Sequence, residues 1–228
     1  MKLLSVDTNA KTKKGQAAGY LTGILYLAPA DMAMRGKNLC PHASEGCKTA
    51  CLFSAGRGAM SNVVSARVNK TLYFFRNREA FLNDIRADIR ALIKKAKKAG
   101  MLPCVRLNGT SDIPWHKFGI MNEFSDVPFY DYTPNEGRMM EYLEGKLPQN
   151  YSLTFSRKEN NNDACLRVLS KGGNVAAVFS GDVPETWEGY ATTDGDKNDL
   201  RFLDAQNVIV ALKAKGKAKQ DTSGFVIH

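Results

Sequence analysis

Residues 102–112, L-P-C-V-R-L-N-G-T-S-D, contain the pattern from which the fold can be predicted. A short apolar segment, residues 102–107, is followed at once by small polar residues. An apolar run of this length, bounded by turn-forming residues, is typical of a buried strand. Further runs of the same kind, each followed by polar residues or stopped by proline, are residues 20–28, 127–130, 151–155, 174–179 and 208–212.

Residues 77–100 have the period of a helix instead. Apolar residues recur there at intervals of three and four positions, namely Phe81, Ile85, Ile89, Leu92 and Ala96. Asn77 suits the N-terminal cap and Gly100 suits the left-handed position after the last turn. This stripe predicts a helix packed on the core. Shorter helical candidates lie at residues 136–143 and 163–171, with a single turn near 200–203.

Strands that alternate with helices are the signature of an α/β fold with a parallel sheet. We expect residues 1–228 to form a single α/β domain, because this length suits one domain with a sizeable core. The expected architecture is a partial (β/α) barrel with parallel strands, in which a cysteine loop follows the first strand at residues 20–28. Residues 1–18 are polar and rich in lysine, which predicts an N-terminal arm.

Polar side chains follow the predicted strands, where parallel strands bring their carboxyl ends to one edge. Ligands of such folds bind at that edge. The candidate cofactor-binding residues are Asn108, Ser111, Asp112, Asp131, Arg157 and Lys158. The alternative explanation is the ordinary polarity of surface loops.

Residues 40–58, C-P-H-A-S-E-G-C-K-T-A-C-L-F-S-A-G-R-G, hold three of the five cysteines. Cys40, Cys47 and Cys51 have the spacing C-x6-C-x3-C, and His42 lies two positions after the first. Thiolates are soft, strong metal ligands, and ligands on one short segment reach a common group with little loss of chain entropy. Two alternatives remain open: a redox dithiol, and cysteines that only pack as small apolar residues.

The kind of metal follows from the number of ligands. Three cysteine thiolates favour a [4Fe-4S] cluster with one iron open to another ligand. Zinc bound by Cys40, Cys47, Cys51 and His42 is the alternative, although the second cysteine knuckle of common zinc sites is missing.

The composition is that of an ordinary globular protein, with a net charge of +9 and 43% hydrophobic residues. An odd number of cysteines, and an N-terminus without an apolar run, predict a reducing, cytoplasmic location with no membrane span. The positive charge suits an anionic small molecule, an acidic redox partner or a nucleic acid, although no nucleic-acid motif is visible. Much of this positive charge lies in residues 94–98 and 213–219. For residues 94–98, a solvated helix face is the simpler interpretation.

Other residues with metal-binding or catalytic side chains have simpler interpretations. Asp194, Asp196 and Asp199 resemble the start of a calcium loop, but the required glycine and glutamate are missing, so we expect a turn at the ligand-binding edge with Arg201 paired to a carboxylate. The remaining thiols and one histidine are expected to pack rather than to react, namely Cys104, Cys165 and His116.

Several segments together resemble a phage protein family named after mycobacteriophage gene product eighty-eight. The segments are G-Y-L-T-G-I-L-Y-L-A-P-A, G-C-K-T-A-C-L-F-S-A-G-R-G, V-R-L-N-G-T-S-D-I-P-W, F-Y-D-Y-T, Y-S-L-T-F-S, D-G-D-K-N-D-L-R-F-L-D and K-A-K-G-K-A-K-Q-D-T-S-G-F-V. The resemblance covers nearly the whole chain. It implies a phage-encoded protein of the host cytoplasm, and it carries no assigned activity.

The cysteine triplet after the first strand is also similar, at the level of architecture, to the radical S-adenosylmethionine enzymes. Their usual spacing is C-x3-C-x2-C, and Ala50 stands here where they carry an aromatic residue. The resemblance implies that Cys40, Cys47 and Cys51 bind the cluster and that residues 108–112 meet the amino group of S-adenosylmethionine. Fold-level similarity does not by itself establish the chemistry.

Two functions are therefore carried forward. The first is an iron-sulfur phage protein, a radical S-adenosylmethionine-like or one-electron redox enzyme. The alternative is a zinc-stabilised basic module that binds nucleic acid. A nuclease is not supported, because no paired-carboxylate metal motif is present.

Overall fold

Strand β2 (Tyr20–Leu25), next to one end of the sheet, has residues that are almost all buried. The computed structural model describes residues 1–6 and 10–228. In this part of the chain the strands form one ten-stranded sheet. The other strands are β1 (Leu4–Val6), β3 (Leu102–Arg106), β4 (Phe129–Thr133), β5 (Tyr151–Ser156), β6 (Val175–Phe179), β7 (Thr186–Trp187), β8 (Tyr190–Asp194), β9 (Ile209–Lys213) and β10 (Val226–Ile227).

The strand order is β1-β2-β3-β4-β5-β6-β9-β8-β7, and β10 pairs with β6 outside this path. Neighbours from β2 to β9, the β8–β9 pair and the β10–β6 pair are parallel, whereas β1 and β7 pair antiparallel at the two ends. The predicted mostly parallel α/β fold is confirmed. Within the described residues the sheet is open, with β1 and β7 at opposite ends.

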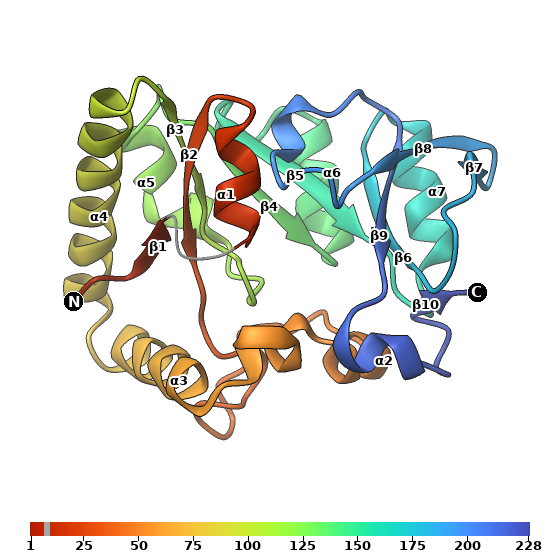
Figure 1. The fold of residues 1–228 in the computed structure, drawn as a ribbon, viewed down its shortest axis with the longest axis horizontal. Helices are drawn as coiled ribbons and strands as arrows, with labels where there is room; N and C mark the ends of the chain where they lie inside the picture. The colour runs from red at the N-terminus through yellow and green to blue at the C-terminus, as the bar shows by residue number, and fades with distance from the viewer. Residues whose placement is uncertain (7–9) are drawn as a thin grey trace.

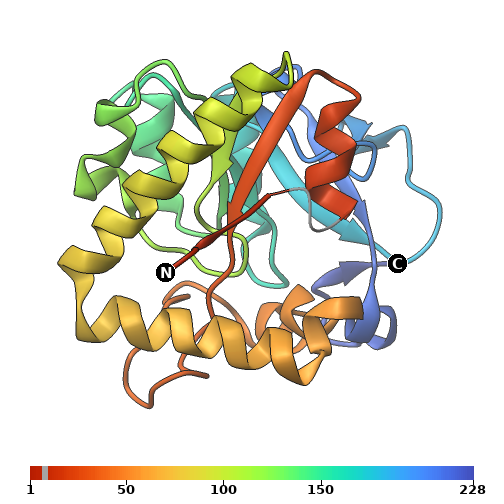
Figure 2. The same ribbon diagram turned by 60° about the vertical axis from the view of Figure 1, so that its left-hand side comes forward.

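Helices α4 to α7 cover one face of the sheet, α1 packs on the other face beside Thr22 and Leu200, and α2 and α3 lie beyond the carboxyl ends of the strands. Figure 1 shows α4 alongside β2 and β3, with α2 and α3 beneath the lower ends of β2 and β9. Figure 2 shows α3 running below that edge of the sheet. The helices are α1 (Ala10–Gln16), α2 (Glu45–Thr49), α3 (Ser61–Arg76), α4 (Arg78–Lys98), α5 (Ile120–Glu123), α6 (Glu136–Leu143) and α7 (Asn162–Ser170), with 3₁₀ turns η1 (Leu52–Ser54), η2 (Gly56–Ala59), η3 (Trp115–Phe118), η4 (Arg201–Leu203) and η5 (Gly216–Gln220).

The strongest predicted helix has the caps that its sequence indicated. The Asn77 side chain accepts a hydrogen bond from the Ala80 N–H at 3.1 Å, and Gly100 takes a φ of +65° after the last turn. All five residues of the apolar stripe are buried in the main core. A left-handed φ costs glycine less than any other residue, so the chain turns there with little strain.

Alternate residues of the strands face two different environments. Val105, Phe129 and Leu153 point to the face covered by α4 to α7 and belong to the main hydrophobic core. Cys104 and Tyr130 point to the other face and form a smaller cluster with Leu200. Because strand side chains alternate in direction, burial of both faces gives the continuous apolar runs seen in the sequence.

Residues 195–203 cross this second face from one end of the strands to the other. Asp196 accepts the backbone N–H of Lys213, at the end of β9. Asp199 forms a buried ion pair with Arg106 at 2.8 Å. At the opposite end Phe202 packs edge-on against Tyr20, the first residue of β2, with ring centroids 5.1 Å apart. The sequence predicted only a turn at the ligand-binding edge. The segment instead fills this face of the sheet.

Three expectations about the first sixty residues need correction. The predicted N-terminal arm contains β1, whose Leu4 is buried, and α1; residues 7–9 lie outside the described chain. The strand at residues 20–28 is therefore the second strand and ends at Leu25. The cysteine segment that follows is partly helical, because Cys47 lies within α2. A local pattern could not reveal β1, which depends on the Asp88 carboxylate accepting the N–H groups of Leu3 and Leu4.

A search of the described helices for a membrane span finds none that is both long enough and sufficiently apolar.

Candidate functional site

The three clustered cysteines lie beyond the carboxyl end of β2. Cys40 is in the connecting segment, Cys47 is in α2, and Cys51 directly follows the cap of that helix. All three are partly exposed and none forms a disulfide. The Ser44 hydroxyl caps α2 by accepting a hydrogen bond from the Cys47 N–H at 3.2 Å. The cap fixes the backbone of Cys47 and does not involve its thiol.

Glu159, in the turn after β5, holds the N-terminus of α2 at this edge of the sheet by hydrogen bonds. Its carboxylate accepts the Gly46 N–H at 2.9 Å and the Ser44 hydroxyl at 2.6 Å. Burial alone would raise the pKa of Glu159, but these hydrogen bonds outweigh burial and hold it below its usual range. A β-carbon on Gly46 would come within 2.8 Å of Phe225, so glycine permits the C-terminal segment to pack directly on α2.

The clustered thiols influence one another electrostatically. Burial, together with smaller contributions from the neighbouring Cys51 and Cys40, raises the pKa of Cys47 to about 12. Burial likewise raises the pKa of Cys40 to about 11, again with a contribution from Cys51, and raises that of Cys51. Binding of a metal group would have to displace protons from these thiols and would therefore weaken at low pH.

His42 and Cys40 are placed at the same edge by different contacts. The Cys40 thiol lies 3.9 Å from the Thr110 carbonyl oxygen, after β3. The exposed His42 ring places Nε2 3.0 Å from the side-chain nitrogen of Asn135. Within the described chain no three His, Cys, Asp or Glu side chains are grouped so as to hold a single metal ion. The four predicted zinc ligands are therefore near one another but not arranged around one ion.

Arg67, on α3, is a residue that sequence analysis missed. Its guanidinium lies over the rings of Tyr26 and Phe53, 4.9 Å and 5.2 Å from their centroids. Nη1 is buried and has no hydrogen-bond partner among the described groups. Burial lowers the pKa of Arg67, while this arginine in turn lowers the pKa of Cys51. A cation held by two rings thus lies within electrostatic reach of Cys51 and keeps an unused donor.

Three of the predicted cofactor-binding residues belong to one buried hydrogen-bond network. Asp131 accepts the backbone and side-chain N–H groups of Asn108 at 2.7 Å and 3.2 Å, and the Tyr151 hydroxyl at 3.1 Å. Ser111 donates to the Asn108 side-chain oxygen at 2.9 Å. Because these groups satisfy one another, they hold the turn after β3 in shape and offer few free atoms to a ligand.

Asp112 has a different environment, with one oxygen paired and one unpaired. Oδ1 accepts from Arg138 Nη1 at 2.6 Å and from the Thr133 hydroxyl at 2.9 Å. Oδ2 is buried with no hydrogen-bond partner in the described structure. Burial raises the pKa of Asp112 despite the neighbouring Arg138. Asp112 in turn raises the pKa of Cys40, which places its carboxylate within electrostatic reach of the cysteines.

Arg157 and Lys158 lie in the turn after β5 and make different contacts. Lys158 donates to the His42 carbonyl at 3.0 Å and lowers the pKa of Cys47. Arg157 donates to the Phe225 carbonyl at 2.9 Å and to the Asn162 side chain at 3.0 Å. The structure therefore places Lys158 beside the thiols, whereas Arg157 mainly ties down the C-terminal segment.

The remaining candidate residues lie outside this site. Cys104 in β3 and Cys165 in α7 are fully buried, as expected for core thiols. His116 is partly buried, and its Nδ1 has no partner in the described residues. Arg201 pairs with Asp204 at 3.3 Å, which the sequence did not single out. Glu159, Arg67 and Arg138 were missed because their partners are far away in sequence, although Glu159 does adjoin the predicted Arg157 and Lys158.

We expect the Asp131→Asn variant to gain stability relative to the wild type as the pH rises from about 4 to about 7. Burial raises the pKa of Asp131 to about 7, even though Arg106 and the hydrogen bonds favour the charged form. An acid with a raised folded-state pKa stabilises the fold most when protonated, and this contribution is lost as pH approaches that value. Urea unfolding across this pH range measures the difference, with exposed Asp163→Asn as the control. A pH-independent difference would contradict the assignment.

Comparisons with known proteins add one match. A family model described as Gene product 88 matches residues 2–228. Searches of the curated proteins and of the solved structures each return no match.

Proposed function

We propose that this chain, which belongs to the Gene product 88 family, is an iron-sulfur protein in which Cys40, Cys47 and Cys51 hold a [4Fe-4S] cluster. The observation that carries the proposal is the placement of three reduced, partly exposed thiols in one segment beyond the carboxyl end of β2, in a mostly parallel sheet. Each thiolate of such a cluster binds a different iron, so its ligands stand farther apart than those of a single ion. Zinc would require all its sulfur ligands within about 2.3 Å of one centre.

The surroundings of the thiols fit a group with negative charge. Thiolates and inorganic sulfides make most protein-bound clusters anionic, and hydrogen bonds to the sulfurs tune the reduction potential. The buried Nη1 of Arg67 has an unused N–H donor and lies in a region that influences Cys51. Lys158 supplies a second positive charge near Cys47. Both cations would favour the deprotonated thiols that a cluster needs.

We infer that the protein is a redox or S-adenosylmethionine-dependent enzyme, because further candidate ligand-binding residues lie at the same edge of the sheet as the cysteines. A cluster with three cysteine ligands supplies one-electron chemistry and an iron open to a further ligand. Asp112 has a buried, unpaired carboxylate oxygen, which suits the ammonium group of an amino acid moiety. Asn108, Ser111 and Asp131 would support the turn that presents it. The open sheet would then correspond to a partial (β/α) barrel, with residues 195–203 against one of its faces.

Metal analysis of protein purified without oxygen tests the proposal directly. We expect a brown protein with broad visible absorption, about four irons per chain and a matching amount of acid-labile sulfide. Chelation or oxidation should remove the colour and the iron together. A colourless protein that carries one zinc per chain would contradict the cluster and favour the alternative.

The alternative is a zinc-stabilised basic module that binds nucleic acid. One observation favours it: the lysine-rich segment after β9 packs on the cysteine segment, because Ala214 and Ala218 share a small hydrophobic cluster with Ala50. Binding to an oligonucleotide should then weaken steeply as salt rises, because phosphate contacts release counterions. Absence of binding at low salt would exclude this function.

A further inference from the structure

A second candidate site lies at the carboxyl ends of β6 and β9, where ligands of open parallel sheets bind. The two strands are paired up to their last residues, Phe179 and Lys213. A cavity of about 590 Å³ opens just beyond them. Its walls are the turn after β6 and the segment after β9, namely Ser180, Gly181, Asp182, Lys213, Ala214, Lys215 and Lys219. This space is a shallow pocket that is open to solvent.

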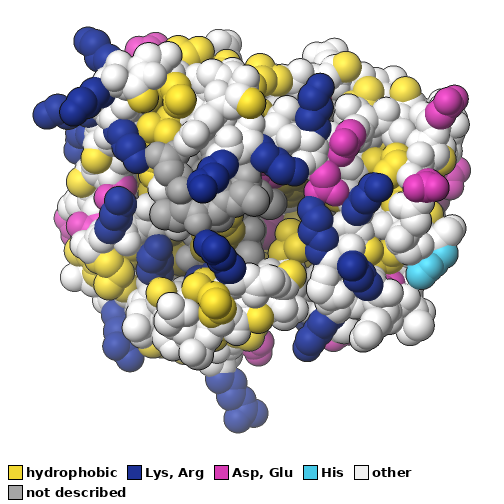
Figure 3. Space-filling view, viewed as in Figure 1, with side chains coloured by type: hydrophobic (Ala, Val, Ile, Leu, Met, Phe, Trp, Pro, Cys, Tyr) yellow, Lys and Arg dark blue, Asp and Glu magenta, His cyan; other side chains and the backbone are white. Residues whose placement is uncertain are grey.

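The charge of this cavity is positive. It contains three lysines and one aspartate. Lys215 is paired with Asp196, just outside the cavity. The ammonium groups of Lys213 and Lys219 form no ion pair with any described residue. Figure 3 shows basic side chains over the lower part of β9 and the adjoining C-terminal segment. Two unpaired cations next to a cavity favour an anionic ligand.

The backbone holds these lysines in fixed register. Asp196 accepts the Lys213 N–H at 3.0 Å, and the Ala214 N–H donates to the Phe179 carbonyl at 2.9 Å. Ala214 and Ala218 are buried, whereas the lysines between and after them are exposed. A segment anchored by two buried alanines presents its charged side chains with little freedom left in the main chain, which lowers the entropy cost of binding.

The turn after β6 lines the same space and has backbone N–H groups without a described partner. The Ser180 N–H donates a hydrogen bond to the Ile227 carbonyl at 2.9 Å. The next two N–H groups, of Gly181 and Asp182, donate to no described atom. A β-carbon on Gly181 would meet nothing within 4 Å, so the space beside this turn is open. Free amide groups next to ammonium groups are the combination that binds phosphate oxygens.

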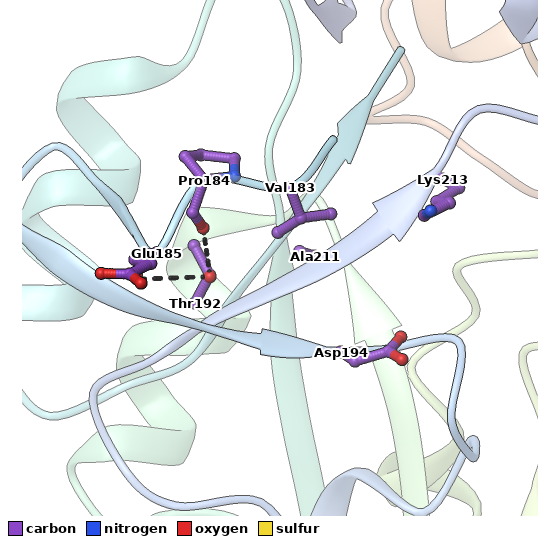
Figure 4. Close-up of a pocket in the computed structure, with 7 residues that line it drawn as sticks. All are labelled: Val183, Pro184, Glu185, Thr192, Asp194, Ala211 and Lys213. Carbon is purple, nitrogen blue, oxygen red and sulfur yellow. Dashed lines mark hydrogen bonds between the residues drawn. The ribbon is translucent and has the colours of Figure 1, made fainter. Parts of the chain in front are cut away.

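A neighbouring cavity of about 430 Å³ shares Lys213 but has different chemistry. Figure 4 shows the Thr192 hydroxyl directed at the carbonyl oxygens of Pro184 and Glu185, to which it donates. Its walls carry two carboxylates, Glu185 and Asp194, against the single lysine. An anionic ligand would be repelled there, so the two cavities are not equivalent.

We propose that the cavity beyond β6 and β9 binds the phosphate or pyrophosphate group of a small phosphorylated compound. Lys213 and Lys219 would neutralise its charge, and the amides of Gly181 and Asp182 would orient its oxygens. The site adjoins the cysteine segment, since Gly216 approaches Ala55 closely and Ala214 shares a cluster with Ala50. The proposal does not depend on a metal, so its test and the iron analysis can fail separately.

Calorimetric titration of the purified protein with inorganic pyrophosphate tests this site. The double variant Lys213→Ala/Lys219→Ala should bind at least about tenfold more weakly than the wild type, because each lost charge-assisted hydrogen bond contributes substantially to affinity. The control is Lys97→Ala/Lys98→Ala at the exposed end of α4, which removes the same charge elsewhere. Its affinity should change less than about twofold. Equal weakening in both variants, or no binding by the wild type, would overturn the proposal.

Parallel titrations identify the source of the phosphate. A nucleoside triphosphate that follows the pyrophosphate pattern supports a small-molecule ligand. Binding confined to a single-stranded oligonucleotide without terminal phosphates, and weakened equally by both variants, would instead report diffuse net charge and overturn the proposal. Because the substituted lysines are exposed, the urea midpoints of both variants should match the wild type, which verifies that folding is intact.

Discussion

Replacement of Arg138 by methionine should lower the free energy of unfolding by about 3–5 kcal/mol, because it leaves a buried charge unpaired. Arg138 and Asp112 are 6% and 3% exposed, and their side chains are joined at 2.6 Å. A second guanidinium nitrogen donates to the Asp112 backbone carbonyl at 3.2 Å. Methionine fills similar space but offers no donor. The Thr133 hydroxyl would remain as a partner, at 2.9 Å, but it carries no charge.

Urea unfolding of Arg138→Met measures this loss, with Arg167→Met as the matched control. Arg167 forms a well-aligned pair with Glu136, at 2.8 Å and 3.1 Å, but its side chain is 56% exposed. Exposed pairs contribute about 0–1 kcal/mol. The Arg138 loss should shrink at acidic pH, because protonation of Asp112 removes the uncompensated charge. Equal losses in the two variants would show that burial of the Arg138 pair is not what stabilises it.

Replacement of Cys47 by alanine should abolish cluster binding while the chain still folds. Cys47 is the thiol whose pKa is raised by both of the other two, so it is electrostatically coupled to each prospective ligand. Its backbone N–H, and not its side chain, donates the capping hydrogen bond to Ser44. Loss of a thiolate ligand removes a bond to iron, whereas alanine retains the geometry of α2.

Iron and sulfide content of anaerobically prepared Cys47→Ala is the measurement, with Cys165→Ala as the control. Cys165 is also a thiol of raised pKa, but it is fully buried in α7 and lies beside the side-chain oxygen of Asn161 at 3.6 Å. The control should keep its iron and lose only some stability from the small cavity. If Cys165→Ala lost iron as completely as Cys47→Ala, the assignment of ligands to the clustered segment would be wrong.

Local patterns predicted those elements whose stability is already visible in neighbouring residues. The stripe from Phe81 to Ala96 and the caps at Asn77 and Gly100 were enough for α4. The alternation of apolar runs with polar turns was enough for the parallel sheet. By contrast, β1 is three residues long and is held by Asp88, more than 80 positions away, and β7 is two residues long and pairs with β8. Short edge strands have too few residues for a pattern to emerge.

The candidate site divides in the same way. Three thiols within twelve residues must lie near each other whatever the fold, and parallel strands must bring their carboxyl ends to one edge. Which polar residues near that edge are available to a ligand could not be predicted. Asn108 and Asp131 satisfy each other, Asp112 keeps a free oxygen, and Arg67 is held between two rings.

The amino-acid order is therefore sufficient for the α/β class, for the principal helix and for the segment that carries the thiols, because each depends on residues within one turn or one strand of each other. Only folding reveals that residues 195–203 fill one face of the sheet, that Arg138 neutralises Asp112, and that a pocket lined by three lysines opens beside Lys213. These features depend on contacts between residues far apart in the chain. No periodicity specifies such contacts, since they form only when separate strands and helices are packed together.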